Sequence, residues 1–258
     1  MNQRNRLELR KFVAPEFVCG QGALRLAGRY AHNLGMRRVL LVTDAGVRAA
    51  GWADAVGESL ASAGASFTIF DSVSPNPRAG EVMAGAEVYR SEDCNGIVAV
   101  GGGSPMDCAK GIGVVSVSGR DILAFEGVDR VSVPPPPLVC VPTTAGTSAD
   151  LSQFAIIRDE MGRRKVAIIS KALVPDISLL DPEPLTTMPR ELTVDTGIDA
   201  LSHAIEAYVS NASSPITDLH ALEAVRLTST ALPEVIESPD DLSLRFSTLL
   251  ASLHAGLA

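Results

Sequence analysis

The stretch GIVAVGGGSPMDCAK, residues 96–110, decides the fold more than any other part of the chain. It begins with a short apolar run of the kind that predicts a buried strand. Three glycines, 101–103, follow this run directly. Ser104 then suits a helix N-cap, and Pro105 suits the first helical position. A strand, a glycine turn and a helix in succession indicate an α/β protein.

The same turn is a candidate site for an anion. Gly102 and Gly103 carry no Cβ, so the backbone can approach a ligand closely. The free N–H groups of the following helix would face that ligand, and the pyrophosphate of a dinucleotide is its natural occupant. Asp107, three residues after Ser104, is counted among the cofactor-binding residues. The pattern is neither G-x-G-x-x-G nor a Walker A loop, so a turn without any ligand is the alternative.

Apolar runs and amphipathic segments alternate on both sides of this stretch. Such alternation indicates βαβ units and a mostly parallel, Rossmann-like sheet that binds a dinucleotide. Strands are expected within 37–44, 65–73, 94–104 and 137–142, and helices near 51–63, within 74–92 and after residue 106.

The pattern becomes helical after SLLDPEPLTTMPRE, residues 178–191. Pro182 and Pro184 mark a boundary, because proline interrupts regular structure. We therefore expect an α/β domain over residues 1–181 and the first part of an all-helical domain over 182–258. Helices are expected at 193–210, 214–232 and 239–258.

Polar residues follow two more of the expected strands. Ligands of open α/β sheets bind outside the carboxyl ends of the strands. Asp44 ends the strand 37–44, where a carboxylate can bind an adenosine ribose and repel a 2′-phosphate, which favours NAD over NADP. PTTAGTSAD, 142–150, offers the hydroxyls of Thr143, Thr144 and Thr147. Simple helix caps are the alternative in both places.

A metal ligand pair is suggested by TGIDALSHAIEAYVS, residues 196–210. Asp199 and His203 are four residues apart, so on a helix they lie on one face. A divalent metal usually takes three or four protein ligands, so this pair would be part of a site. Alone, such a pair is more often a cap or a surface pair.

Composition limits the function classes. The net charge of −8 argues against binding of nucleic acid or an anionic membrane. The four cysteines form no C-x-x-C pair or zinc-like spacing, which favours reduced thiols. The N-terminus has no apolar signal-peptide core, and no run is long enough to span a membrane. We expect a cytoplasmic protein that binds small ligands.

Three motifs in this order, GGGSPMDCAK, PTTAGTSAD and TGIDALSHAIEAYVS, resemble the iron-containing (group III) alcohol dehydrogenase family. The resemblance extends from about Phe12 to the C-terminus. It implies a dinucleotide-binding domain, a helical domain and an active-site cleft between them. It also implies an oxidoreductase that transfers hydride between an alcohol and NAD(P), assisted by Fe²⁺ or sometimes Zn²⁺.

The resemblance also implies roles for individual residues. Asp44 would bind the adenosine ribose, and Asn76 would lie near the cofactor. Lys165 would reach the nicotinamide ribose. Asp199 and His203 would be the first two metal ligands. The pyrophosphate would bind to Gly102, Gly103 and Ser104, and the adenine and phosphate side would be lined by Thr143, Thr144 and Thr147.

The chain departs from the family pattern in two places. In GTSADLS the family more often has Gly-Ser-Glu after the Gly-Thr, which puts the contacts of Ser148 to Asp150 in question. The family's two further metal-binding histidines have no counterpart in this chain. His32 is expected on the surface, and His220 is expected to be an ordinary helical residue. His254 falls at a position of the family pattern that carries no metal ligand. We therefore expect a C-terminally truncated chain whose uncovered helices self-associate into a homo-oligomer. The alternative function is a non-catalytic dinucleotide-binding protein or oligomer subunit.

Overall fold

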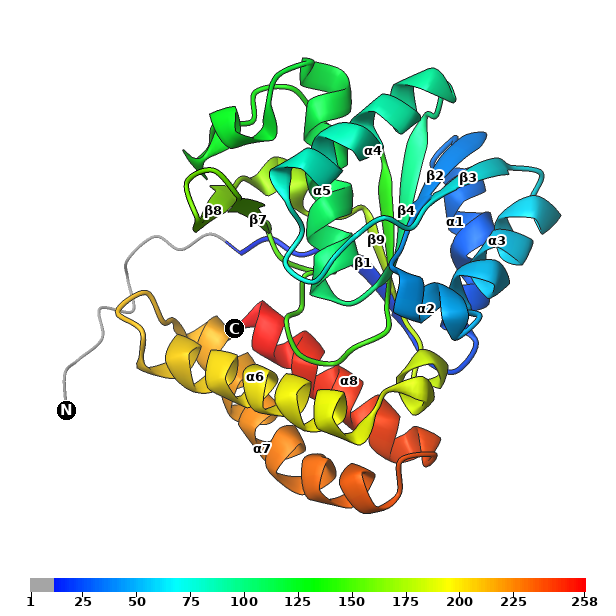
Figure 1. Cartoon of the computed structure of the whole chain (residues 1–258). Helices are drawn as coiled ribbons and strands as arrows, with labels where there is room; N and C mark the ends of the chain where they lie inside the picture. Colours follow the sequence, from blue (N-terminus) through cyan, green and yellow to red (C-terminus); the bar gives the residue numbers. More distant parts are fainter. Residues whose placement is uncertain (1–11) are drawn as a thin grey trace.

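The computed structural model describes residues 12–258, in which a parallel sheet flanked by helices precedes three long helices (Figure 1). Residues 1–11, on which the expected absence of a signal peptide partly rests, lie outside the described residues. All strand pairs of the main sheet are parallel, which confirms the expected fold class. Its strand order is β1 (Glu16–Cys19), β9 (Ile177–Leu180), β6 (Leu138–Pro142), β4 (Gly96–Gly101), β2 (Arg38–Val42) and β3 (Ser66–Phe70).

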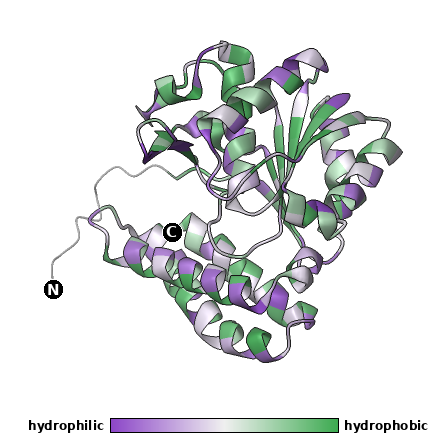
Figure 2. Ribbon diagram, viewed as in Figure 1, coloured by the Kyte–Doolittle hydropathy of each residue, from purple (hydrophilic) through white to green (hydrophobic). Residues whose placement is uncertain are grey.

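Both faces of this sheet are buried. Successive side chains of a strand point to opposite faces. Leu40 of β2 therefore joins the core under α4 (Ala79–Ser91) and α5 (Gly103–Ser118). Its neighbour Leu41 joins the core under α1 (Ala27–Asn33) and α3 (Trp52–Ser62). This double coverage explains why the central strands are continuous apolar runs, seen in green in Figure 2.

The strand order places a crevice between β2 and β4. The chain leaves β2 through the short helix α2 (Ala45–Ala49) and α3 to reach β3 on one side. It leaves β4 through α5 to reach β6 on the other side. The two connections thus diverge at the carboxyl ends of adjacent strands, where open α/β sheets bind ligands.

Several short elements were not expected from the sequence. They include the edge strand β1, strand β9 and a second sheet in the order β5 (Gly127–Val128), β8 (Arg164–Ile169) and β7 (Phe154–Asp159). β1 and β9 form through pairing between distant segments, which a local pattern does not predict, whereas β7 and β8 are neighbouring segments that form an antiparallel hairpin. The 3₁₀ turns are η1 (Ala23–Leu26), η2 (Ile122–Phe125), η3 (Lys171–Leu173) and η4 (Glu183–Thr187).

The three expected C-terminal helices are present and pack against one another as α6 (Arg190–Val209), α7 (Pro215–Glu237) and α8 (Leu242–Leu257). The expected end of α7 at residue 232 was wrong, because the helix continues through Pro233. Leu232 and Val235 on either side of this proline are buried, and their packing offsets the lost backbone hydrogen bond. None of the helices in the described part of the chain is long and apolar enough to cross a membrane.

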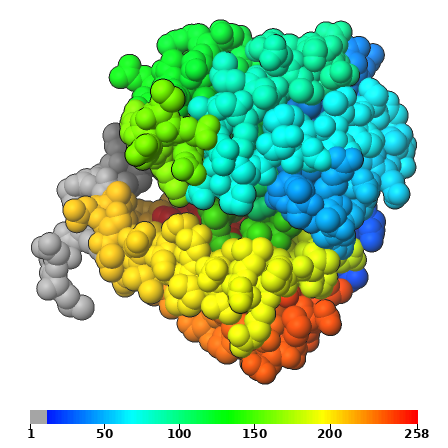
Figure 3. All heavy atoms as spheres, viewed as in Figure 1, coloured from blue at the N-terminus to red at the C-terminus, as the bar shows by residue number. Residues whose placement is uncertain are grey.

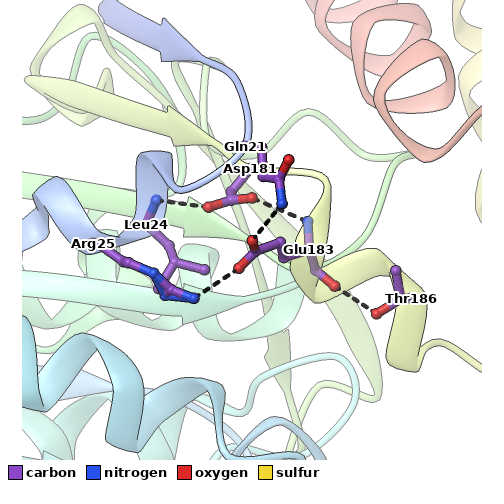
Figure 4. Close-up of polar contacts among 6 residues, drawn as sticks. All are labelled: Gln21, Leu24, Arg25, Asp181, Glu183 and Thr186. Carbon is purple, nitrogen blue, oxygen red and sulfur yellow. Dashed lines mark hydrogen bonds and ion pairs between the residues drawn. The ribbon is translucent and has the colours of Figure 1, made fainter. Parts of the chain in front are cut away.

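A set of polar contacts holds the segment that joins the sheet to the helices (Figure 4). The buried carboxylate of Asp181 accepts hydrogen bonds from the N–H groups of Leu24 and Glu183, each at 3.0 Å. The carboxylate of Glu183 in turn accepts from Gln21 and Arg25, each at 3.1 Å. The expected domain boundary at 181/182 falls within this anchored segment and stays a prediction.

Candidate functional site

A cleft of about 690 Å³ lies at the carboxyl ends of the central strands. Figure 3 shows the hollow between α6, in yellow, and the sheet-bearing part of the chain. This volume is in the range of small-molecule sites. The helical side of the cleft is lined by Pro184, Thr187, Met188, Pro189, Leu192 and Thr196. The sheet side includes seven of the expected cofactor residues, namely Asp44, Gly102, Gly103, Ser104, Thr143, Thr144 and Thr147.

The glycine turn and the threonine loop pack directly against each other. A Cβ on Gly102 would be 3.0 Å from Oγ1 of Thr144, and one on Gly103 would be 2.9 Å from Oγ1 of Thr147. A Cβ at either position would press on a threonine side chain, so glycine allows this close approach. The two motifs, about 40 residues apart in the sequence, form one wall of the cleft.

The expected N-cap at Ser104 was wrong. Helix α5 begins at Gly103 with Gly102 as its N-cap, and no side chain of the described residues caps it. The Ser104 hydroxyl instead accepts a hydrogen bond from the N–H of Asn76 at 3.1 Å. The first N–H groups of α5 are thus left without a side-chain partner at the edge of the cleft.

Asp44 is a helix cap and also lines the cleft. Its Oδ1 accepts a hydrogen bond from the N–H of Val47 at 2.9 Å, so it caps α2. It also lines the cleft opposite the glycine turn. The second carboxylate oxygen has no such capping contact, which is consistent with a further role in ligand binding.

Three expected cofactor residues do not line this cleft. Asn76 has a positive φ of 58° and contacts the glycine turn through its backbone N–H. Lys165 lies on the exposed hairpin strand β8, opposite Arg158 of β7. Lys165 is not among the residues that line the cleft, and its contact with the nicotinamide ribose stays a prediction.

Asp107 faces away from the cleft. Its Oδ2 accepts a hydrogen bond from the N–H of Ile156 in β7 at 3.1 Å. Burial raises the pKa of this carboxyl to about 6, and nearby Lys110 opposes the shift. The buried Lys110 ammonium donates to the carbonyls of Ser152 and Phe154, each at 2.8 Å. Asp107 is thus engaged by β7 and is not among the residues that line the cleft, which does not support the cofactor role expected of it.

Ser148 and Asp150, where the sequence departs from the family pattern, make structural contacts. The Ser148 hydroxyl donates to the carbonyl of Ser252 in α8 at 2.6 Å. The buried Asp150 carboxylate accepts from the Ser178 hydroxyl at 2.6 Å, and burial raises its pKa. These contacts attach the threonine loop to both the helices and the sheet.

Trp52 was not predicted as a site residue. Its indole N–H donates to Oγ1 of Thr187 at 2.9 Å, and both residues line the cleft. This bond joins α3 to η4 across the cleft. The one signal in the sequence that could have indicated this residue is that Trp52 is the only tryptophan of the chain.

Asp199 and His203 lie on the face of α6 that continues from the cleft. Thr196 lines the cleft, and the two residues follow it at three and seven positions, a spacing that places all three on one side of a helix. Oδ1 of Asp199 is 3.7 Å from Nε2 of His203, and both side chains are about 40% exposed. Within residues 12–258, no group of three or more histidine, cysteine or acidic side chains is placed to hold a metal.

His220 and His254 contact each other, which the sequence did not predict. Their Nδ1 atoms are 2.9 Å apart, across α7 and α8. The reading of His220 as an ordinary helical residue was therefore incomplete. His32 is exposed, as predicted.

Comparison with known proteins assigns the family. A model of the iron-containing alcohol dehydrogenase family matches residues 14–182, and a model of the C-terminal part of the same family matches residues 193–258. The chain belongs to the iron-containing alcohol dehydrogenase family. The fold and the resemblance expected from the three motifs are thereby confirmed.

Individual members of the iron-containing alcohol dehydrogenases cover nearly all of this chain. The NAD-dependent methanol dehydrogenase of Bacillus methanolicus is 36% identical over 96% of the chain. The 1,3-propanediol dehydrogenase of Citrobacter freundii is 39% identical over 93%. Among solved structures, a 1,3-propanediol oxidoreductase has a TM-score of 0.95 at 37% identity, covering 97% of this chain and 66% of its own.

A sulfoacetaldehyde reductase from Bifidobacterium kashiwanohense, solved in complex with NAD⁺, has a TM-score of 0.89 at 30% identity. It is matched over 97% of this chain and 66% of that structure. The chain spans 65% of the Bacillus methanolicus enzyme and 62% of the Citrobacter freundii enzyme. The activity of this chain is therefore a matter for proposal.

Proposed function

We propose that this chain binds NAD⁺ or NADH in the cleft and takes part in hydride transfer between a small primary or secondary alcohol and the nicotinamide. The observation that carries the proposal is the convergence of Asp44, the glycine turn and the threonine loop at the switch point between β2 and β4. Bound NAD⁺ would accept the hydride, and the protein would supply position and charge.

The residues of the cleft suit the parts of a dinucleotide. The uncapped N-terminus of α5 would donate backbone hydrogen bonds to the pyrophosphate, since Gly102 and Gly103 allow it to approach. Asp44 would accept hydrogen bonds from the adenosine ribose. The hydroxyls of Thr144 and Thr147 line the same wall. The apolar side chains of Met188 and Leu192 would restrict water near the nicotinamide end.

The metal proposed from the family is only partly accommodated by the described residues. Asp199 and His203 would supply one carboxylate oxygen and one imidazole nitrogen to Fe²⁺ or Zn²⁺, which would polarise the alcohol oxygen. A group of three or more ligands is absent from residues 12–258. The incomplete ligand set among these residues is the reason to test a second candidate, a protein that binds the dinucleotide without catalysing alcohol oxidation.

NAD⁺ reduction with a panel of small alcohols, with Fe²⁺ or Zn²⁺ added, distinguishes the two candidates. We expect metal-dependent turnover that falls by about 100-fold or more in His203→Ala, because losing a direct ligand should cost at least as much as losing its outer partner. His32→Ala, on an exposed position of α1, is the matched control. NADH binding without turnover at any metal concentration would support the non-catalytic candidate instead.

Coenzyme preference should depend on Asp44. In Asp44→Asn the capping oxygen is kept and the negative charge is lost, so the repulsion of a 2′-phosphate disappears. We expect the ratio of NADP⁺ to NAD⁺ affinity to rise about tenfold, measured by fluorescence titration of the reduced forms. Asp93→Asn removes an equal charge beside Arg38, at the other end of the sheet, and should leave the ratio unchanged. An unchanged ratio in Asp44→Asn would exclude this role.

We also propose that the chain forms a homo-oligomer through α6 and α7. Large apolar side chains are exposed on both helices, including Val209 at 67% and Leu219 at 71%. Exposed apolar surface of this kind marks association sites. Light scattering should show an oligomer that dissociates when Leu219 and Leu222 are both replaced by lysine. A monomer at all protein concentrations would exclude this association.

A further inference from the structure

The two imidazoles of His220 and His254 form a contact that the proposed reaction does not use. Their Nδ1 atoms are 2.9 Å apart, and their ring centroids are 5.2 Å apart with an interplanar angle of 34°. Phe12 stacks on His220 at 6.0 Å between ring centroids. Both histidines are partly exposed, so solvent reaches the pair. The two rings join the start of α7 to the end of α8.

The environment favours neutral rings, the form that binds metals. Burial lowers the pKa of His220. Burial and the neighbouring His220 lower the pKa of His254, with a further lowering by Arg226 and an opposing effect of Glu223. A neutral imidazole has one N–H and one lone pair, so a single proton occupies the contact between the two Nδ1 atoms. Each ring can move that proton to Nε2 and present its Nδ1 lone pair.

We propose that His220 and His254 bind one late first-row divalent cation, Cu²⁺, Ni²⁺ or Zn²⁺, at a site separate from Asp199 and His203. Metal–imidazole bonds are about 2.0–2.1 Å long, so two nitrogens at right angles around one metal are about 2.9 Å apart. The observed separation of the Nδ1 atoms matches this value. Imidazole nitrogen is a preferred ligand of these metals, and right-angled positions are typical of Cu²⁺ and Ni²⁺.

The remaining ligands of this site would come mainly from water, since the described residues place no third metal-binding side chain beside the pair. Glu223 lies three residues after His220 on α7 and acts electrostatically on His254. Its carboxylate is engaged by the guanidinium of Arg226 at 2.6 and 2.8 Å. Binding shifts the shared Nδ1 proton to Nε2 of the same ring, so no net proton is released.

Calorimetric titration of the metal-free chain with Ni²⁺, Cu²⁺ and Zn²⁺ tests the proposal. We expect His254→Leu to weaken Ni²⁺ binding at this site by at least about tenfold, since even an outer partner of a metal ligand contributes that much. His220→Asn should have the same effect. His32→Leu and His203→Asn should keep the site. Ni²⁺ should also raise the thermal midpoint of the wild type and of both controls, because it bridges α7 and α8.

Three results would overturn the proposal. One is equal Ni²⁺ affinity in the wild type and His254→Leu. Another is binding that is lost in His203→Asn but kept in His254→Leu. The third is wild-type protein that binds none of the three metals at this position. Far-UV circular dichroism checks that each variant is folded. If His254→Leu does not fold, the Ni²⁺ affinity of His220→Asn is compared with that of the wild type instead.

Discussion

Gly103→Val is expected to weaken NADH binding by about 100-fold or more while leaving the chain folded. A Cβ at this position would lie 2.9 Å from Oγ1 and 3.1 Å from Cγ2 of Thr147. The two further methyl groups of valine would occupy the space in front of the α5 N-terminus, where the pyrophosphate is proposed to bind. Hydrogen bonds to a charged group contribute about 1.5–3 kcal/mol each, so losing two of them accounts for a change of this size.

The matched control for this substitution is Gly113→Ala, on the same helix but away from the cleft. Its Cβ would be 3.3 Å from Cβ of Pro135, a tight contact outside the proposed binding residues. NADH affinity, measured by fluorescence titration, should be unchanged in this variant. Equal affinity in Gly103→Val and the wild type would show that the dinucleotide does not bind at the glycine turn.

The core of the sheet and the position of the cleft were predictable from local sequence. The apolar run 96–101 is buried on both faces, and such runs are recognisable in any sequence. The turn at Gly102 and the loop at Thr144 each follow a strand, so their meeting at one edge follows from parallel pairing alone. The edge strand β1 and its neighbour β9 have only four residues each and gain their structure from their partners.

The errors at individual site residues have a common physical cause. Ser104 has the composition of an N-cap, but the glycines before it let the helix begin earlier, at Gly103. Asp107 binds the N–H of Ile156 in β7, a contact between distant segments that the local pattern does not predict. His220 and His254 are 34 positions apart in the sequence, and their contact depends on how α7 packs on α8. Periodicity predicts the helices but not the rotation that brings two side chains together.

The largest effect on stability is expected from Gly28→Ala. Gly28 lies in α1 where this helix crosses α3, and a Cβ there would be 2.0 Å from the carbonyl oxygen of Ser59. The N–H of Gly28 also donates to the Ser59 hydroxyl at 2.9 Å, and that hydroxyl donates to the carbonyl of Arg25 at 2.6 Å. The clash involves backbone, which no change of side-chain rotamer relieves, so the two helices must move apart.

Separating α1 from α3 would loosen the core on one face of the sheet, which includes the buried side chains of Leu24, Val56 and Leu60. Overpacking of a tight core costs about 1–3 kcal/mol, and we expect Gly28→Ala to lie at the upper end. For a chain of this size, a loss of about 3 kcal/mol lowers the thermal midpoint by about 6–12 °C. Urea denaturation followed by circular dichroism measures the change in the free energy of unfolding.

Gly80→Ala in α4 is the control that separates this clash from the general effect of adding a methyl group to a helix. No atom lies within 4 Å of a Cβ built on Gly80. Alanine loses less conformational entropy than glycine on folding, so this variant should be more stable by about 0.5–1 kcal/mol. Opposite signs for the two substitutions would locate the effect in the contact of α1 with α3. A stabilised Gly28→Ala variant would contradict this contact. It would mean that α1 and α3 are further apart than the distance of 2.0 Å between a Cβ on Gly28 and the Ser59 carbonyl oxygen implies.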